Sequence, residues 1–236
     1  MENRLFDYMN RRISGDFIPT QQNKEPGPVI TISRQSGCGA SSIAWGVCTE
    51  LNKMKNQAKP GANWSVISRE ILQKSAEQLH LDPRALQHVI GDKDRGIMDQ
   101  IVDALSTHAH KSDQKIIKTV HDVIWQFGNN GNVVIVGRGG AAICSGIKNS
   151  LHIRLEAPEE WRVNEIVKRL DFSKTFARDY IRKQDVEREL LVTKLFGKKA
   201  DLNAYDIEMN RSRFSEKEIV DAIIQLATVK GMIKHI

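Results

Sequence analysis

The sequence predicts an α/β fold in which a parallel sheet is covered by helices on both faces. Two patterns support this fold: most of the β-branched or apolar strand-like runs show no polar alternation, and the runs alternate with helical stretches along the chain. The length of 236 residues suits one α/β domain. Apolar residues make up 40% and charged residues 27%, close to the averages of globular proteins, which excludes a disordered or fibrous chain.

The expected elements follow one another after a linker. Residues 1–27 are interpreted as an N-terminal extension and linker, and residues 28–236 as the domain. The five expected strands are Val29–Ser33, Trp64–Ser68, Val133–Val136, Leu151–Leu155 and Tyr205–Met209. The expected helices are Ser41–Asn52, Arg69–Leu79, Gln114–Phe127, Glu159–Leu170 and Ser215–Leu226. Ser215 and Glu218 have the spacing of a capping box at the start of the last helix.

Two connections are longer than the ~2–6 residues of an ordinary strand–helix loop. The first lies between the second and third strands, where residues 69–128 are rich in both charges and are expected to form a small helical lobe. The second lies between the fourth and fifth strands, where residues 171–200 are expected to be irregular. The two insertions account for the length of the single domain.

A glycine-rich turn between the first strand and the first helix is the most informative segment. Such a turn can point backbone N–H groups into one concavity, and the helix that follows presents free N–H donors to an anion. The full P-loop pattern is GxxxxGK[ST]. Here Arg34 stands at the first glycine, Gly39 at the second and Ala40 at the lysine. The match is partial, so a turn that binds nothing is the alternative to a phosphate site.

The net charge of +6, with a pI near 9.2, favours a polyanionic partner. Residues 161–199 hold 11 basic and 6 acidic side chains, so their net charge of +5 accounts for most of the excess. This concentration favours phosphates bound by one segment over a general nucleic-acid surface. Aromatic residues make up only 6% and do not cluster among basic ones, as stacking on nucleic-acid bases requires.

The three cysteines, Cys38, Cys48 and Cys144, form no CxxC pair, and their odd number favours a reducing, cytoplasmic location. No apolar run approaches the ~20 residues of a membrane span, so no membrane partner is expected. The basic N-terminal segment is interpreted as a packing or homodimer segment, with weak membrane-surface binding as the alternative. Cys38 lies in the glycine-rich turn, where it is either a reactive thiol or a small residue that fills the turn.

Three segments, Ile32–Gly39, Val133–Gly140 and Leu151–Pro158, resemble the cytidylate kinase-like family, a divergent branch of the P-loop nucleoside monophosphate kinases. In this family a lysine-free ISRQxGxGG segment commonly replaces the usual loop. The resemblance covers about residues 29–226. It implies a three-layer α/β/α fold of the P-loop NTPase type, with a five-stranded parallel sheet and an adenylate-kinase-like core. It also implies that residues 69–128 hold the acceptor monophosphate and that residues 171–200 form a lid.

The resemblance further implies phosphoryl transfer from ATP to a nucleoside monophosphate, CMP or dCMP, with Mg²⁺ as the metal. The residues that would bind ATP phosphates by motif position are Ser36, Gly37, Cys38, Gly39, Ala40, Ser41 and Ser42, with Ser42 also touching Mg²⁺. The arginines expected to stabilise the transferred group are Arg34, Arg162, Arg169, Arg182 and Arg188. The residues expected to bind the acceptor are Arg69, Arg138, Asp185 and Arg188.

Two departures from the family pattern keep other functions open. Gly139 stands where cytidylate kinases carry an aspartate. The strand before it, Val133–Val136, contains no acidic residue that could hold a metal. Glu70 and Asp206 lie near strand ends and could hold it indirectly. The alternatives are an inactive nucleotide-binding sensor, a kinase of another small phosphate-accepting metabolite, or an RNA-binding module. The basic residues of the helices could also form an ordinary solvated face.

Overall fold

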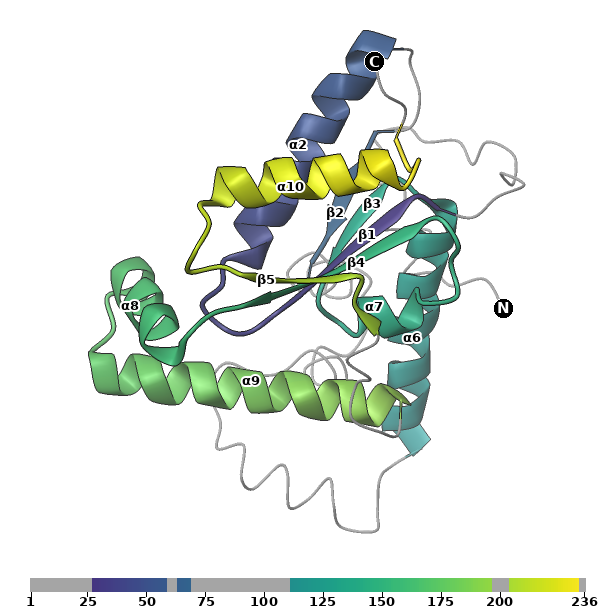
Figure 1. Cartoon of the computed structure of the whole chain (residues 1–236). Coiled ribbons are helices and arrows are strands. Elements are labelled where there is room, and N and C mark those ends of the chain that lie inside the picture. Colours follow the sequence, from purple (N-terminus) through teal and green to yellow (C-terminus); the bar gives the residue numbers. More distant parts are fainter. Residues whose placement is uncertain (1–26, 59–62, 69–110, 197–203, 234–236) are drawn as a thin grey trace.

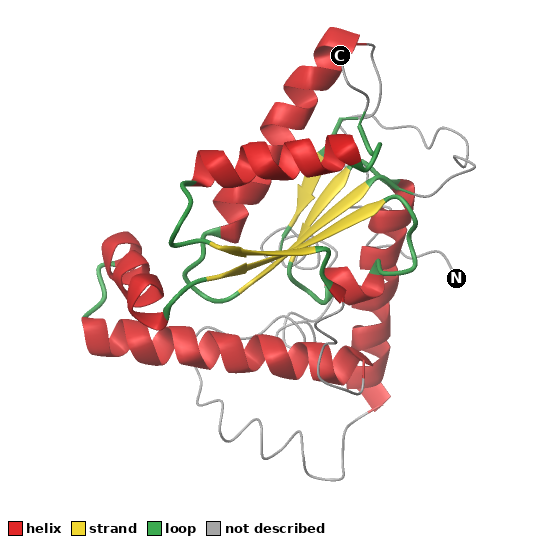
Figure 2. Ribbon diagram, viewed as in Figure 1, coloured by secondary structure: helices red, strands yellow, loops and turns green. Residues whose placement is uncertain are grey.

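The structure, a computed structural model, describes residues 27–58, 63–68, 111–196 and 204–233. Within these residues a five-stranded, all-parallel sheet has the strand order β2-β3-β1-β4-β5 (Figure 2). The strands are β1 (Val29–Arg34), β2 (Ser65–Ile67), β3 (Val133–Val136), β4 (Ser150–Glu156) and β5 (Ile207–Asn210). The predicted fold class is therefore confirmed, and each strand lies within two residues of its expected bounds.

Helices cover both faces of the sheet and make three layers (Figure 1). The helices of the described residues are α2 (Ala40–Ala58), α6 (Lys111–Asn130), α7 (Gly140–Ile143), α8 (Glu159–Leu170), α9 (Lys174–Phe196) and α10 (Glu216–Val229). One face carries α2 and α10, and the other carries α6 and α7. The inserted lobe expected at residues 69–128 is described only in its last helix, α6, because residues 69–110 lie outside the described part of the chain.

The strands β1 and β3 are buried on both faces, since every residue of Val29–Ile32 and Val133–Val136 is at most 1% exposed. Ile30 and Ile32 of β1 pack with Val134 of β3 in the core beneath α2 and α10. Thr31, between them, points to the opposite face and is also buried. Since all strands run in the same direction, their carboxyl ends meet at one edge of the sheet. The glycine-rich turn, α8 and α9 follow these ends.

The segment after α8 differs from expectation: the prediction that residues 171–200 are irregular is wrong. Lys174–Phe196 is one continuous helix of 23 residues, and it contains no glycine or proline. Its amino-terminal half packs Ala177 and Ile181 against α8. The prediction failed because the apolar contacts described for α9 lie in this half, where Ala177 and Ile181 pack against α8. Such short contacts leave no long apolar stripe in the sequence to mark a helix.

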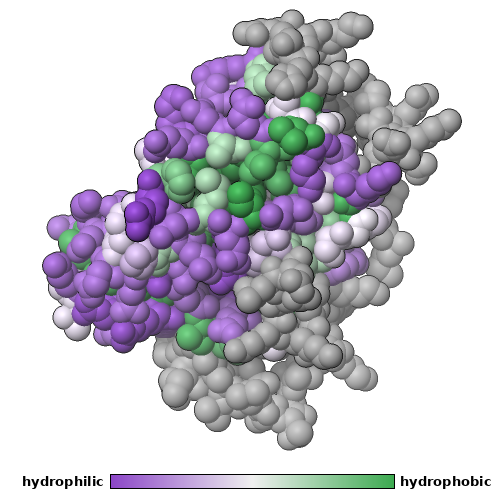
Figure 3. Space-filling model, in the orientation of Figure 1, coloured by the Kyte–Doolittle hydropathy of each residue, from purple (hydrophilic) through white to green (hydrophobic). Residues whose placement is uncertain are grey.

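The predicted capping box at the start of α10 is confirmed. The Glu218 backbone N–H donates to the Ser215 side chain over 3.2 Å, and the Ser215 N–H donates to the Glu218 carboxylate over 2.8 Å. This cap orients α10 across the sheet, where Ile219 and Ile223 are fully buried. In Figure 3 the surface over α8 and α9 is mostly hydrophilic, whereas a hydrophobic patch lies over α10.

None of the helices in the four described ranges is sufficiently long and apolar to cross a membrane.

Candidate phosphate-binding site

The glycine-rich turn joins the carboxyl end of β1 to the start of α2. Gly37 has a φ of +92° and Gly39 a φ of +69°, values that L-residues avoid. Positive φ at alternate residues turns successive backbone N–H groups toward one side, which is the geometry of an anion-binding nest. Ala40, at the lysine position of the P-loop pattern, is buried as the first residue of α2. We call residues Arg34–Ser42 the phosphate loop.

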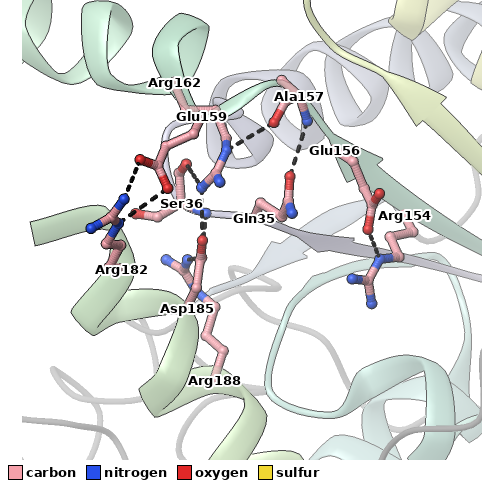
Figure 4. Close-up of polar contacts among 10 residues, drawn as sticks. All are labelled: Gln35, Ser36, Arg154, Glu156, Ala157, Glu159, Arg162, Arg182, Asp185 and Arg188. Carbon is pink, nitrogen blue, oxygen red and sulfur yellow. Dashed lines mark hydrogen bonds and ion pairs between the residues drawn. The ribbon is translucent and has the colours of Figure 1, made fainter. Parts of the chain in front are cut away.

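Arg162 of α8 holds the phosphate loop from one side (Figure 4). Its side chain is only 8% exposed. Its Nε donates to the Ala157 carbonyl over 3.0 Å, and its Nη1 donates to the Ser36 carbonyl over 3.1 Å. Because this guanidinium contacts the chain just before α8 as well as the loop, it fixes one against the other.

Asp185 of α9 holds the same part of the loop from the other side. Its Oδ1 accepts from the Ser36 backbone N–H over 2.6 Å, and its Oδ2 accepts from Arg162 Nη1 over 2.7 Å. Arg188, one turn further along α9, donates to Oδ1 over 3.0 Å. The predicted residues Ser36, Arg162, Asp185 and Arg188 therefore meet in one place, which we call the Asp185 cluster.

Close packing explains why the loop needs a glycine next to this cluster. A Cβ added at Gly37 would lie 2.9 Å from both the Cβ and the carbonyl oxygen of Arg162. Gln35, which the sequence did not single out, ties the start of the loop to the β4–α8 connection. Its Oε1 accepts from the Ala157 N–H over 3.1 Å. The ISRQ segment thus supplies contacts to the β4–α8 connection as well as the turn itself.

A groove of about 360 Å³ opens beside the phosphate loop. Gly37, Cys38, Gly39, Ser42 and the predicted Arg169 contribute to its lining. Its other lining residues were not predicted as site residues; they are Trp161, Glu165, Lys168, Arg211 and Glu216. A signal for two of them was present in the sequence, since Trp161 and Lys168 lie on the predicted helix that carries Arg162.

Contacts of Arg211 and Ser42 shape the groove. The Arg211 guanidinium lies over the Trp161 ring, 5.3 Å from its centroid. Ser42 Oγ lies 2.8 Å from both Glu216 Oε1 and the Gly39 carbonyl oxygen, so a single hydroxyl proton faces two acceptors. Arg211 also lies 3.4 Å from Glu216 Oε1. The groove therefore combines an aromatic–cation wall with a carboxylate beside the start of α2.

The other predicted residues are spread around this edge. The Arg34 guanidinium packs against Gly137 in the turn after β3, and the neighbouring Arg138 has a left-handed φ of +57°. Arg182 is 61% exposed and pairs with Glu159. Ser41 is exposed on the first turn of α2. Arg69 and Glu70 lie outside the described residues.

The reactive-thiol alternative for Cys38 is wrong. Cys38 is 1% exposed, and burial raises the pKa of its thiol to about 11 despite the nearby Arg162 charge. A buried, protonated thiol is a poor nucleophile. Cys38 is thus the small residue that fills the turn.

Asp206 does not lie where it could assist a metal at the loop. It precedes β5, at the amino end of the strand, whereas the phosphate loop lies at the carboxyl ends. Its carboxylate accepts from the His152 N–H over 2.7 Å and from Lys230 over 3.0 Å. Across the residues that the structure describes, no group of three or more His, Cys, Asp or Glu side chains could hold a metal ion.

Comparison with known proteins agrees with the sequence and the fold. A model of the cytidylate kinase-like family matches residues 29–213. No curated protein matches the chain. Among solved structures, an uncharacterized protein from Eubacterium ventriosum ATCC 27560 has a TM-score of 0.59 at 18% identity, over 85% of this chain and 98% of that one. A sugar kinase from Janibacter sp. HTCC2649 has a TM-score of 0.47 at 12% identity, over 89% of this chain and 100% of that one.

The structural likeness to the Eubacterium protein shows a shared fold, and the family match supports phosphoryl transfer as the general reaction. That match extends over most of the described chain and includes the phosphate loop, α8 and α9. The predicted resemblance is confirmed: the chain belongs to the cytidylate kinase-like family.

Proposed function

We propose that the chain transfers the terminal phosphoryl group of ATP to a nucleoside monophosphate, with CMP or dCMP as acceptor. The observation that carries the proposal is the phosphate loop: its two left-handed glycines lie between a buried strand and a helix N-terminus, with Arg162 and Arg188 beside them. Backbone donors and guanidinium groups are the chemistry that binds phosphate. Family membership supplies the reaction class.

In this proposal the groove beside the loop binds the donor nucleotide. Its volume of about 360 Å³ is in the range of small-molecule sites. Trp161 and the Arg211 that lies over it offer a flat surface for stacking. The donor phosphates would extend from the groove into the loop, where the N–H groups of Gly37–Ala40 would hold them. Arg169, at the groove wall, would neutralise part of their charge.

The described residues fit Mg²⁺ in the way that phosphate-bound magnesium usually requires. Mg²⁺ keeps several waters and takes one or two protein oxygens together with substrate phosphates. Ser42 Oγ and Glu216 Oε1, 2.8 Å apart at the loop, would supply those protein oxygens. When bound there, the metal would neutralise charge on the donor phosphates.

The chain itself forms no bond in the proposed reaction. An oxygen of the acceptor phosphate attacks the γ-phosphorus of ATP, and the bond from that phosphorus to the bridging oxygen of ADP breaks. Positioning and charge stabilisation supply the catalysis. Arg34 would replace the missing loop lysine, since a guanidinium carries the same charge and can bind phosphate through two N–H groups. Arg138 and the Asp185–Arg188 pair would face the acceptor, and α9 would act as the lid.

A coupled assay of ADP release with Mg²⁺ tests the proposal over a panel of nucleoside and deoxynucleoside monophosphates. We expect turnover with CMP or dCMP that is lost in the Arg34→Ala/Arg188→Ala double variant. The matched control, Lys174→Ala/Lys183→Ala, removes two exposed cations from α9 and should keep the wild-type rate. Wild-type turnover no faster than that of the arginine double variant would refute the proposal.

Two features favour a second function, a nucleotide-binding sensor without turnover. Ala40 is buried at the position where an active P-loop carries a lysine, and Gly139 replaces the aspartate of cytidylate kinases. A melting temperature raised by ATP, with no ADP release for any acceptor, would favour the sensor. Turnover on another small phosphate-accepting metabolite would keep the proposed phosphoryl transfer and replace only CMP or dCMP as the acceptor.

A further inference from the structure

The Asp185 cluster has the donor set of a phosphate site, yet a carboxylate of the same chain fills it. Three donors converge on Asp185: the Ser36 backbone N–H at 2.6 Å, Arg162 Nη1 at 2.7 Å and Arg188 Nη1 at 3.0 Å. One backbone N–H and two guanidinium groups form the combination that binds a phosphoryl group. Figure 4 shows the Asp185 carboxylate beneath Ser36, between the loop and α9.

Two of the three donors, the Arg162 guanidinium and the Ser36 N–H, are fixed independently of Asp185. Arg162 is buried and also binds the Ser36 and Ala157 carbonyls, so its guanidinium keeps its place when the carboxylate leaves. The Ser36 N–H belongs to a turn that Gln35 and Gly37 hold against the α8 segment. Departure of Asp185 would therefore leave these two donors in place for a ligand.

Asp185 can leave more easily than its partners. Its side chain is 28% exposed, against 8% for Arg162, so rotation away from the loop returns the carboxylate to water. Asp185 contributes one negative charge to the cluster, and Arg162 and Arg188 contribute two positive charges. With Asp185 in place the cluster has a net charge of +1, and without it the net charge is +2, which strengthens attraction for an incoming anion.

We infer that, in the ligand-free chain, the Asp185 carboxylate occupies the place that a phosphoryl oxygen of the ligand takes at the Ser36 N–H. Phosphate and α9 then compete for the same donors, and ligand binding releases Asp185 from the loop. The contact is autoinhibitory: it lowers the net charge of the cluster from +2 to +1 and occupies its donors until a phosphate displaces it. The inference rests on the proposed function only in taking phosphate as the ligand of the loop.

Calorimetric titration with inorganic pyrophosphate, at fixed ionic strength, tests this competition. The Asp185→Asn variant removes the charge but keeps the shape of the side chain. We expect it to bind pyrophosphate about tenfold more tightly than wild type, or better, since its loop donors no longer carry a competing anion. The control Asp179→Asn removes one exposed charge from the same helix and should bind as wild type does. Equal or weaker binding by Asp185→Asn would overturn the inference.

A measurement on the wild-type chain covers the case in which Asp185→Asn does not fold. Hydrogen exchange with and without pyrophosphate should show slower exchange in the phosphate loop and faster exchange around Asp185 in α9. Slower exchange in both segments would overturn the inference. The kinase assay separates the two proposals. If Asp185→Asn binds pyrophosphate more tightly but the wild-type chain turns over no acceptor, the inference holds and the proposed function fails. If the wild-type chain turns over an acceptor but Asp185→Asn binds no more tightly, the proposed function holds and the inference fails.

Discussion

Gly37→Ala tests how the phosphate loop is built. Gly37 has a φ of +92°, and an added Cβ would lie 2.9 Å from both the Cβ and the carbonyl oxygen of Arg162. Two effects should therefore add: a backbone conformation that alanine disfavours, and a clash with backbone that cannot rotate away. Two other glycines separate these effects. Gly231 has a φ of +70° with no atom within 4 Å of the added Cβ, and Gly146 has neither constraint.

The expected magnitudes follow from these geometries. The conformational cost of alanine at positive φ is roughly 1–2 kcal/mol. For Gly231→Ala this is the whole expected cost. Forcing a methyl group into a packed space costs a further ~1–3 kcal/mol, so Gly37→Ala should lose about 2–5 kcal/mol of unfolding free energy. Gly146→Ala should change stability by no more than about 0.5 kcal/mol.

Urea unfolding of the three variants measures these free energies, and pyrophosphate titration measures the loop. Gly37→Ala should also weaken pyrophosphate binding, whereas the other two variants should bind as wild type does. A stability loss for Gly37→Ala within about 0.5 kcal/mol of that for Gly231→Ala would refute the close-packing argument.

Three further predictions concern buried groups. Arg162→Ala leaves Asp185 and the Ser36 carbonyl without their buried partner, so urea unfolding should show a loss of about 3 kcal/mol; a loss under about 1 kcal/mol would contradict the role of this guanidinium. Burial lowers the pKa of His152, so the unfolded chain binds more protons as pH falls below about 6.5. Stability should drop from pH 7.5 to 5.5, and less in His152→Gln; an equal drop would contradict this reasoning. The Cys38 thiol, with a pKa of about 11, should resist a disulfide reagent at pH 7.5 until the chain unfolds, and rapid labelling of the native chain would contradict its burial.

The fold was predictable because its signals are local. The unbroken apolar run of β3 reflects burial on both faces of the sheet. Ser215 with Glu218 fixes the start of α10 through contacts three residues apart. The long helix α9 was not predicted, because its stability depends on packing that only the folded chain provides. The sequence shows that residues 174–196 contain no glycine or proline. It does not show the surface of α8 against which Ala177 packs.

The site was predictable only where the family motif names residues. Ser36, Arg162, Asp185 and Arg188 were expected in the site, with Asp185 and Arg188 on the acceptor side, and the structure brings the four residues together. That the Asp185 carboxylate binds the Ser36 N–H could not be read from positions 149 residues apart. Glu216 was missed for the same reason: its contact with Ser42 joins segments 174 residues apart, and no local pattern marks it.

The most direct test of the central claim is a crystal structure of the chain with ADP and Mg²⁺. The account predicts the β-phosphate at the N–H groups of Gly37–Ala40, the base in the groove beside Trp161, and the Asp185 carboxylate displaced from Ser36. ADP bound elsewhere, or bound in the loop with the Asp185–Ser36 contact of 2.6 Å intact, would contradict it.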